Sequence, residues 1–494
     1  MQDTDTAQNP LSLEDLSLVK HRSVTGVLAL VSRTFFVQIV AFAATFILSV
    51  YLTPSIYGTF FLVSAVINFL TYFSDIGLAA ALIQKKQAPT NIDLATTFSV
   101  QQLLVVSLVS VLFLSTPMLR RVYHLTDPAV FLLWALAISF FISSLKTIPT
   151  ILLERNLQFG KLVIPQILET LAFNLVAVFL AIKGFGVTTF TLAVLIRAVV
   201  GLVAIYIVSP WRPTLGFSKA SLVSLLRFGV PYQANTFLAV IKDDGVTLVL
   251  GTLIGQQGLG FIGWATKWAF LPLRFFMDNV TKVAFPAFSR LQSHPDQLRL
   301  GLEKTLYFLC LVSLPAFVGI GLLASPMVHL LPRYLKWEPA ILPLYLYLTN
   351  AFWATLTTPM TNALVAVGRI KLTFKYMLMW TGLTWTLTPL LAKFYGTNGV
   401  AFAAALVSAS SVIVLFQMTR DYRLNLISAV MPPLAATGVM AIVLLLARGW
   451  FDQMSFLPVF ILLGGLVYTT SIMLITKGKV FADIRSVIMK QKLT

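Results

Sequence analysis

Long apolar stretches separated by short polar segments follow one another along almost the whole chain. Each is long enough to cross a hydrocarbon core of about 30 Å as an α-helix. Most of them end at Gly, Pro or charged residues, where membrane helices stop. The pattern predicts an all-α, polytopic membrane protein with about 14 transmembrane helices. The predicted spans are residues 27–52, 56–82, 95–116, 129–151, 163–182, 187–208, 223–250, 256–282, 302–324, 341–366, 374–394, 398–418, 428–448 and 454–475.

The composition agrees with a chain whose main solvent is the lipid bilayer. Of its 494 residues, 58% are hydrophobic and only 11% are charged, whereas soluble domains carry about 25% charged residues. The net charge of +18 does not predict a nucleic-acid partner, because the basic residues are scattered among short loops. The single cysteine, Cys310, lies inside an apolar stretch and excludes an intramolecular disulfide.

The distribution of Lys and Arg predicts the orientation in the membrane. Of 36 such residues, 22 fall in the tails and loops of one side and 7 in the loops of the other. Cytoplasmic loops carry the excess of positive charge, so both termini are expected in the cytoplasm. Residues 1–26 lack the pattern of a cleaved signal peptide, and we interpret them as a tail with a short interfacial helix near residues 11–19.

The sequence also indicates an internal repeat. At an offset of 202, Tyr57-Gly58 falls on Leu259-Gly260. Because the shift covers six spans, an even number, the two copies share one orientation, as in transporters built from parallel repeats. The further matches are Pro149 with Pro359 and Lys161 with Lys371 at offset 210, and Gly186 with Gly399 at offset 213.

The repeat and the spans together predict a division of the chain into two lobes of six helices with two further helices. We expect a cytoplasmic tail in 1–26, the first lobe in 27–210, the second lobe in 211–420, helices 13 and 14 in 421–476, and a cytoplasmic tail in 477–494.

Charged residues inside the eighth span are the sharpest sign of a wet interior. Lys267, Arg274, Asp278 and Lys282 are spaced by 7, 4 and 4 residues and share one stripe of an ideal helix. The stripe either lines a cavity or forms a buried intrahelical ladder of the last three residues. Lys267 has no acid four residues away, so we favour the cavity.

The seventh span contains Lys242, Asp243 and Asp244 in succession. Neighbouring helical residues point about 100° apart, so at most two of the three side chains face one lumen. Gln233 lies eleven residues before Asp244 and shares its face. Alternatively, Gly245 marks a helix break near the outer surface, and both interpretations remain open.

Five further candidate ionisable residues lie within spans, where charge is costly and usually functional, and one of them, Lys146, lies near a cytoplasmic helix end. Glu169 and Arg197 are expected to pair between the fifth and sixth helices, as a structural or a gating pair. Asp75 is a candidate coupling carboxylate or, as we favour, a tether between helices. Arg33 lies near a cytoplasmic helix end, where it faces the lumen or reaches the interface.

Motifs for cofactors or catalysis are not expected to act here. The GxGxxG match at 258–263 lies in a membrane hairpin without a βαβ unit. The sequence has no P-loop, its four histidines lack ligand spacing, and no nucleophile stands beside a base. We therefore expect no cofactor, no metal site, no ATP hydrolysis and no enzyme activity.

Several short motifs in fixed order resemble the Wzx/WzxC-type polysaccharide exporters of the multidrug/oligosaccharidyl-lipid/polysaccharide exporter superfamily. The resemblance implies two lobes in a V shape, alternating access, and a bacterial inner-membrane location. It also implies the transfer of an undecaprenyl-pyrophosphate-linked oligosaccharide to the outer leaflet, with the polymerase and glycosyltransferases of the pathway as candidate partners. The motifs are YLTPSIYG at 51–58, FSDIGL at 73–78, LRFGVP at 226–231, LPLR at 271–274, FPAFSRLQ at 285–292 and AVGR at 366–369.

This resemblance gives the membrane charges candidate roles. A cleft with basic groups would hold the pyrophosphate, and acidic groups would couple transport to an ion or gate it. The substrate-path candidates are Arg33, Lys267, Arg274, Arg197, Lys282 and Gln233, and the coupling or gating candidates are Asp75, Glu169, Lys242, Asp243, Asp244 and Asp278. A multidrug exporter and a lipid II flippase share the expected fold. A membrane polymerase or ligase would need a sizeable outer loop, which the sequence lacks.

Overall fold

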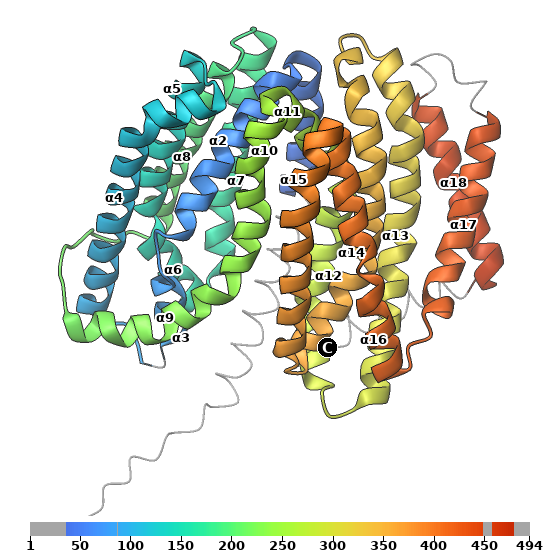
Figure 1. The fold of residues 1–494 in the computed structure, drawn as a ribbon. Helices are drawn as coiled ribbons and strands as arrows, with labels where there is room; N and C mark the ends of the chain where they lie inside the picture. Colours follow the sequence, from blue (N-terminus) through green and yellow to red (C-terminus); the bar gives the residue numbers. More distant parts are fainter. Residues whose placement is uncertain (1–35, 86, 448–456, 479–494) are drawn as a thin grey trace, which may run out of the picture.

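The computed structural model describes residues 36–85, 87–447 and 457–478, and Arg33, residues 1–26 and residues 479–494 lie outside this range. The described chain is almost entirely helical (Figure 1). The first half consists of the helix Phe36–Tyr51, α2 (Pro54–Tyr72), α3 (Leu78–Gln84), α4 (Asn91–Tyr123), α5 (Asp127–Ser144), α6 (Thr147–Arg155), α7 (Phe159–Ile182) and α8 (Thr188–Val208).

The second half follows without an intervening domain. Figure 1 shows α17 and α18 beside α13, at the far edge from α4. The elements are α9 (Lys219–Val240), the π-helical η1 (Ile241–Gly245), α10 (Val246–Leu253), α11 (Gly255–Ala269), α12 (Leu271–Arg290), α13 (Pro295–Leu330), the 3₁₀ turn η2 (Leu335–Ala340), α14 (Ile341–Ala366), α15 (Ile370–Ala409), α16 (Val412–Tyr422), α17 (Leu426–Ala447) and α18 (Leu457–Thr476).

Nine helices in the described part of the chain are long and apolar enough to cross a membrane, so the protein is a multi-pass membrane protein. The sequence predicted fourteen spans, and the difference has physical causes. Residues 370–422 count as one stretch in this number, although the backbone of Gly396 is not helical and divides them between the two expected spans, and the first helix is described only from Phe36. The remaining three expected spans, α9–η1–α10, α11–α12 and α14, are interrupted or more polar.

Two expected helices are bent rather than straight. The eighth span breaks at Phe270, between α11 and α12, where φ is −90° and ψ is 1°. The seventh span does not break at Gly245, as one interpretation had it, because η1 continues the helix as a single π turn. A Cβ at Gly245 would lie 3.1 Å from the ring of Trp385, so the glycine admits this tryptophan against the turn.

The closest approach between the two halves of the chain involves a pair of glycines. A Cβ at Gly58 would lie 1.5 Å from the carbonyl oxygen of Gln256, and a Cβ at Gly260 would lie 1.8 Å from that of Pro54. Only glycine permits two helices to approach so closely. The contact is reciprocal at an offset of 202 residues, in agreement with the repeat expected for this segment.

Further along the chain the backbone corrects the repeat. Gly186 and Gly396 both adopt a left-handed φ, of 59° and 57°. Each immediately precedes a membrane helix, the second one lying within α15, where Gly396 interrupts the helical backbone. The equivalent of Gly186 is therefore Gly396 at offset 210, and the expected match with Gly399 is three residues off.

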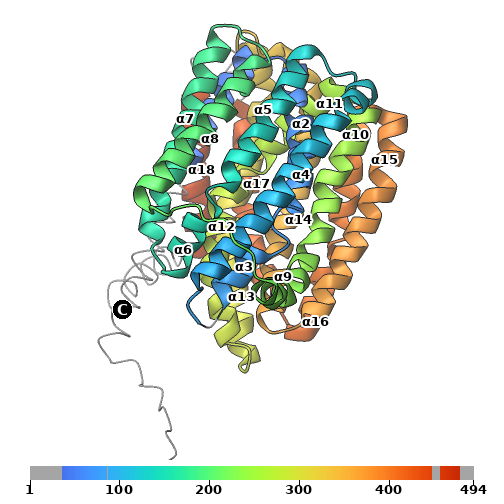
Figure 2. The ribbon, with the colours of Figure 1, turned by 90° about the vertical axis from the view of Figure 1, so that its left-hand side faces the viewer.

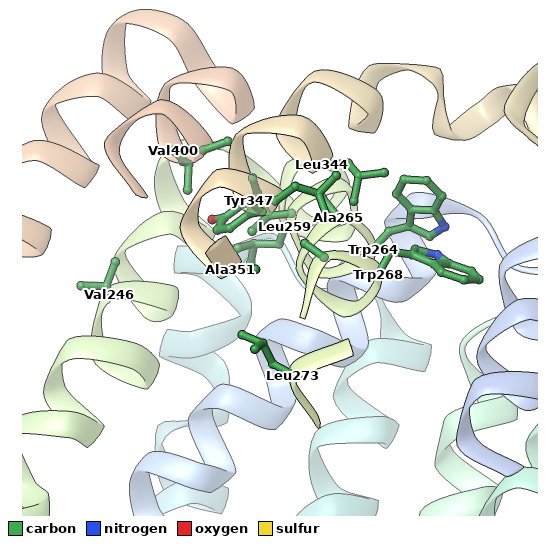
Figure 3. Packing of buried hydrophobic residues seen from close by; sticks show 14 of the residues in the cluster. Val246, Leu259, Trp264, Ala265, Trp268, Leu273, Leu344, Tyr347, Ala351 and Val400 are labelled. Atoms are coloured by element: carbon green, nitrogen blue, oxygen red, sulfur yellow. The ribbon is translucent and has the colours of Figure 1, made fainter. Parts of the chain in front are cut away.

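The apolar core continues across the contact between the halves. Figure 3 shows Leu344, Tyr347 and Ala351 of α14 packed near Leu259 and Ala265 of α11, all buried in one cluster. The same cluster includes Tyr57, whose ring meets that of Trp337 edge-on at 5.4 Å. We call the end of the bundle where Figure 1 shows α11, the top of the picture, the upper end, and η2 packs against α11.

Candidate functional site

Two basic side chains meet midway along the bundle, between the first helix and the α11–α12 pair. Lys267 and Arg274 line one small cavity together with Gln38 and Thr45 of the helix Phe36–Tyr51. The break at Phe270 disturbs the expected helical stripe, yet both side chains still reach the same space. Neither forms a salt bridge with a described side chain, and the side chain of Asp278, four residues after Arg274, is not among these.

A positive charge inside a membrane protein is costly and usually faces a cavity or a charged partner. The cavity beside Lys267 has a volume of about 40 Å³. This space suits a water molecule or two rather than a pyrophosphate. The basic site is therefore contracted in this conformation and must widen to admit a charged ligand.

A large apolar groove adjoins the basic cavity. It has a volume of about 810 Å³ and shares Phe42, Trp268 and Leu271 with the basic cavity. Its far side is formed by α13, α17 and α18, through residues such as Leu444 and Tyr468. A long apolar chain in this groove would bring a polar group at its end next to the two basic side chains.

At the upper end, the first helix is joined to η2 by hydrogen bonds. The hydroxyl oxygens of Ser49 and Tyr334 lie 2.6 Å apart. Trp337 donates from Nε1 to the Ser49 carbonyl oxygen at 2.8 Å, and Lys336 donates from Nζ to that of Val50 at 2.7 Å. Ser49 and Trp337 are fully buried, so these contacts close the upper end.

At the opposite, lower end, α9 crosses beside α3 and α4, as Figures 1 and 2 show. Asp93, at the start of α4, accepts hydrogen bonds from Lys85 at 2.5 Å and from the Ser221 hydroxyl of α9. It also accepts from the backbone N–H of Thr90 at 2.8 Å and so completes a capping box. One buried carboxylate thus joins a helix cap to a contact between the halves.

Two further contacts hold the lower end together. Gly77 has φ 78°, and a Cβ there would lie 2.2 Å from the carbonyl oxygen of Gly229. Gln233 donates to the Tyr72 carbonyl oxygen at 2.7 Å, and the Tyr72 hydroxyl donates to the Gln233 carbonyl oxygen. Gln233, expected on the substrate path, therefore lies at a contact between α2 and α9. The halves touch at both ends in this conformation.

The expected pair of Glu169 and Arg197 is present and has a third member. Arg197 Nε lies 3.7 Å from Glu169 Oε2, and Lys146 Nζ lies 2.5 Å from Glu169 Oε1. A Cβ at Gly201 would lie 2.0 Å from Oε1, so the glycine makes room for the carboxylate against α8. Lys146 is mostly buried and does not extend to an interface.

The charges of η1 separate into two sets. Lys242 and Asp243 pair with each other at 2.6 Å and line a common cavity. Asp244 instead hydrogen-bonds the side chain of Asn68 on α2. Only Asp244 therefore connects the two halves, which agrees with the expectation that the three side chains cannot share one face.

The remaining candidates lie elsewhere or outside the description. Both carboxylate oxygens of Asp75 accept from the backbone N–H of Ala79, at 3.0 and 3.2 Å, and hold the start of α3. Among the described contacts this replaces the expected tether between helices. Lys282 is exposed on α12. The side chain of Asp278 and all of Arg33 are outside the described part, so the ladder between Arg274, Asp278 and Lys282 stays untested.

Comparison with known proteins assigns the chain to a family. The model of the family described as polysaccharide biosynthesis protein matches residues 25–341, more than half of the chain. The chain belongs to the polysaccharide biosynthesis protein family. This assignment agrees with the resemblance to polysaccharide exporters noted from the sequence motifs, most of which lie in the matched region.

Individual relatives agree with this family. The lipopolysaccharide biosynthesis protein WzxC of Escherichia coli K12 is 25% identical over 345 residues, covering 69% of this chain and 70% of WzxC. The teichuronic acid biosynthesis protein TuaB of Bacillus subtilis 168 is 26% identical over 304 residues, covering 61% of this chain and 62% of TuaB. The names of both relatives refer to the making of surface polysaccharides.

The fold of this polysaccharide biosynthesis protein is also found in a transporter of solved structure. The inward closed conformation of the lipid II flippase MurJ superimposes with a TM-score of 0.76 at 17% sequence identity. The match covers 91% of this chain and 99% of MurJ. At this identity the likeness concerns the fold alone.

Several residues of the site carry little signal in the sequence. Lys146 precedes a short helix and is hard to distinguish from an interfacial lysine. Asp93 belongs to a Thr-x-x-Asp pattern that predicts a capping box, but its Ser221 partner is 128 residues away. Ser49 and Tyr334 are uncharged and 285 residues apart, so only the three-dimensional structure brings them together.

Proposed function

We propose that this protein flips a lipid-linked oligosaccharide, joined to its lipid through a pyrophosphate, from the cytoplasmic to the outer leaflet. The observation that carries this proposal is that Lys267 and Arg274 line one cavity beside an apolar groove of about 810 Å³. The family and the names of WzxC and TuaB support a role in polysaccharide biosynthesis.

The two parts of the site suit the two parts of such a substrate. A polyprenyl chain gains free energy by contact with the apolar groove and needs no polar partner there. A pyrophosphate at the end of the chain would meet Arg274, whose planar guanidinium binds phosphate oxygens in pairs, and Lys267, which acts as a point charge. Phe42 and Trp268 border both parts.

Alternating access accounts for the contacts at both ends. The Ser49–Trp337 contacts would open toward the outer side, and the Asp93–Ser221 contacts toward the cytoplasm. Asp244, bound to Asn68, is our candidate gating group between the halves. For Glu169 we infer a positioning role, because it neutralises part of the charge of Lys146 and Arg197 inside one half.

The arrangement of the chain in the membrane is part of the proposal. We infer fourteen spans in two six-helix lobes, residues 27–210 and 211–420, with α17 and α18 added. The reciprocal contact of Gly58 and Gly260 supports two equivalent lobes. The excess of basic residues on one side supports termini in the cytoplasm and an upper end that faces the outer side of the inner membrane.

Surface polysaccharide in the producing bacterium tests the proposal. In a strain that lacks the gene, Lys267→Gln and Arg274→Gln together should fail to restore the polymer, and lipid-linked precursor should accumulate on the cytoplasmic side. Lys371→Gln, an exposed lysine at the start of α15, is the matched control and should restore it. Normal polymer with the double variant at wild-type protein levels would contradict the proposal.

A lipid II flippase is the second candidate, because MurJ has the same fold and lipid II also joins sugars to a polyprenyl pyrophosphate. Depletion of the protein separates the two functions. Loss of surface polymer with intact peptidoglycan supports the first, and cell lysis with blocked peptidoglycan synthesis supports the second.

A further inference from the structure

A second polar cavity, distinct from the basic site, lies on the other side of α11. It has a volume of about 500 Å³, within the range of about 300–1,000 Å³ that holds small-molecule ligands. Nine Thr or Ser residues and one Asn line it, from α10, α11, α14, α15 and the turn after α15, together with several aromatic rings. We call it the threonine cavity, and the lining residues used in the argument are Asn350, Thr357, Trp380 and Ser408.

Five of the nine hydroxyl groups of the threonine cavity already donate their hydrogens to backbone carbonyl oxygens. Thr357 Oγ1 donates to the Trp353 carbonyl oxygen at 2.9 Å, and Ser408 Oγ donates to that of Ala405 at 2.8 Å. Asn350 donates through Nδ2 to the Ala404 carbonyl oxygen at 3.2 Å. Their oxygen lone pairs remain free to accept, so the lining favours a ligand rich in hydrogen-bond donors.

The charge of the cavity limits the ligand further. Its charged residues, Lys242 and Asp243, pair with each other at 2.6 Å and cancel. A pyrophosphate therefore finds no net positive charge here, in contrast to the cavity of Lys267 and Arg274. A bare cation meets the ammonium group of Lys242 beside the carboxylate. The lining fits a neutral molecule.

Aromatic side chains supply the third feature. Trp353, Trp380 and Phe270 line the cavity, and the π face of such rings attracts the partly positive C–H groups of a flat apolar surface. The Nε1 of Trp380 is buried and has no hydrogen-bond partner among the described residues. This nitrogen has almost no surface open to the cavity, so the contribution of Trp380 to a ligand is its ring.

A neutral ligand with many hydroxyl donors, some acceptors and apolar C–H faces is a saccharide. We propose that the threonine cavity binds a sugar of the lipid-linked oligosaccharide, an assignment that rests on the proposed function. Thr266 lines this cavity while the next residue, Lys267, lines the basic one. Since a helix is about 10 Å across, sugar and pyrophosphate would be held on two sides of α11.

Phe61 of α2 also lines the threonine cavity, although all its other lining residues belong to the second half. Movement of the halves therefore changes one wall of the cavity. A sugar bound there would be held in one conformation more tightly than in the other, which is the condition for a ligand to bias a conformational equilibrium.

Two binding probes separate the sugar site from the pyrophosphate site. One is the free repeat-unit oligosaccharide released from the surface polymer of the producing strain, and the other is undecaprenyl pyrophosphate without sugar. Each is titrated calorimetrically into the full-length protein in lipid nanodiscs. Thr357→Val and Asn350→Leu should each weaken oligosaccharide binding about twofold to tenfold, the effect of one hydrogen bond, without changing the second probe.

Thr355→Val is the matched control for Thr357→Val. Thr355 is buried on the same α14, makes the same type of bond to the Ala351 carbonyl oxygen at 2.8 Å, and does not line the cavity. Thr355→Val should leave the binding of both probes unchanged, and Trp380→Phe should weaken the binding of the oligosaccharide alone.

Three results would overturn the sugar site. They are wild-type oligosaccharide binding in Thr357→Val and Asn350→Leu, an equal loss of binding for both probes in these variants, and a loss of oligosaccharide binding in the control Thr355→Val as large as that in Thr357→Val. Failure of the proposed function looks different, because wild-type protein would then bind undecaprenyl pyrophosphate no better than Lys267→Gln/Arg274→Gln does.

Discussion

The glycine contact between α2 and α11 gives a sharp test of how the halves close. In Gly58→Ala the new Cβ would lie 1.5 Å from the Gln256 carbonyl oxygen, and Cβ atoms essentially never come closer than 3.0 Å to another heavy atom. The two helices must therefore separate by about 1.5 Å, and overpacking of this kind costs about 1–3 kcal/mol. The clash destabilises only the conformation in which the upper end is closed, because α2 and α11 are in contact there.

A shift of about 1–3 kcal/mol changes a two-state equilibrium about 5- to 150-fold. Ser49→Cys reports the change, because Ser49 is fully buried in the closed upper end and the natural Cys310 is buried as well. In nanodiscs, a water-soluble maleimide should label Ser49→Cys/Gly58→Ala faster than Ser49→Cys by a factor in that range, provided that opening precedes labelling.

Gly438→Ala is the control, since a Cβ at Gly438 would meet nothing within 4 Å. It should label at the rate of Ser49→Cys alone. Equal labelling of the Gly58→Ala and Gly438→Ala proteins would refute the reasoning, because the α2–α11 contact would then not determine access to Ser49.

Three further predictions concern the polar contacts. Glu169→Gln leaves Lys146 and Arg197 without their acid and should destabilise the protein by about 3–5 kcal/mol in thermal unfolding, whereas Lys146→Met/Glu169→Met should recover much of the loss; equal stability of both variants would contradict a buried pair. Burial and the nearby Arg333 lower the pKa of Lys336 to about 8. The folded protein therefore binds fewer protons than the unfolded chain between pH 8 and the ordinary lysine pKa of 10.5, so the burial of Lys336 destabilises the fold fully below pH 8 and progressively less as pH rises through this window. The Tm of wild type relative to Lys336→Met should increase over that window, and parallel pH profiles would exclude the effect. Asp93→Asn weakens the contact with Lys85 and should speed hydrogen exchange at the start of α9, while unchanged exchange would show that the lower end closes without it.

The sequence predicted what depends on local pattern and on composition. Apolar length and the sparseness of charge led to a multi-pass helical membrane protein, and the order of short motifs led to the family. The pair of Glu169 and Arg197 was also expected, because two opposite charges in adjacent spans have few alternatives to each other. Lys267 and Arg274 were grouped through helical phase, and the structure brings them together even though the helix breaks between them.

Other features depend on contacts between distant residues and on bends. The π turn at η1 and the break at Phe270 follow from packing, about which a hydrophobicity pattern carries no information. The closures at Ser49–Tyr334 and Asp93–Ser221 join neutral or capping residues far apart in the chain. The threonine cavity has no sequence signature, because threonines in membrane helices usually bond their own backbone, and only the fold shows that so many surround one space.

The most direct test of the central claim is transfer of the substrate by the purified protein. Liposomes contain undecaprenyl-pyrophosphate-linked repeat unit, and a pyrophosphatase added outside cleaves only the molecules that reach the outer leaflet. The wild-type protein should raise the cleaved fraction above that of protein-free liposomes, and Lys267→Gln/Arg274→Gln should leave it at the protein-free level. Wild-type protein that never exceeds empty liposomes, or a double variant as active as wild type, would contradict the account.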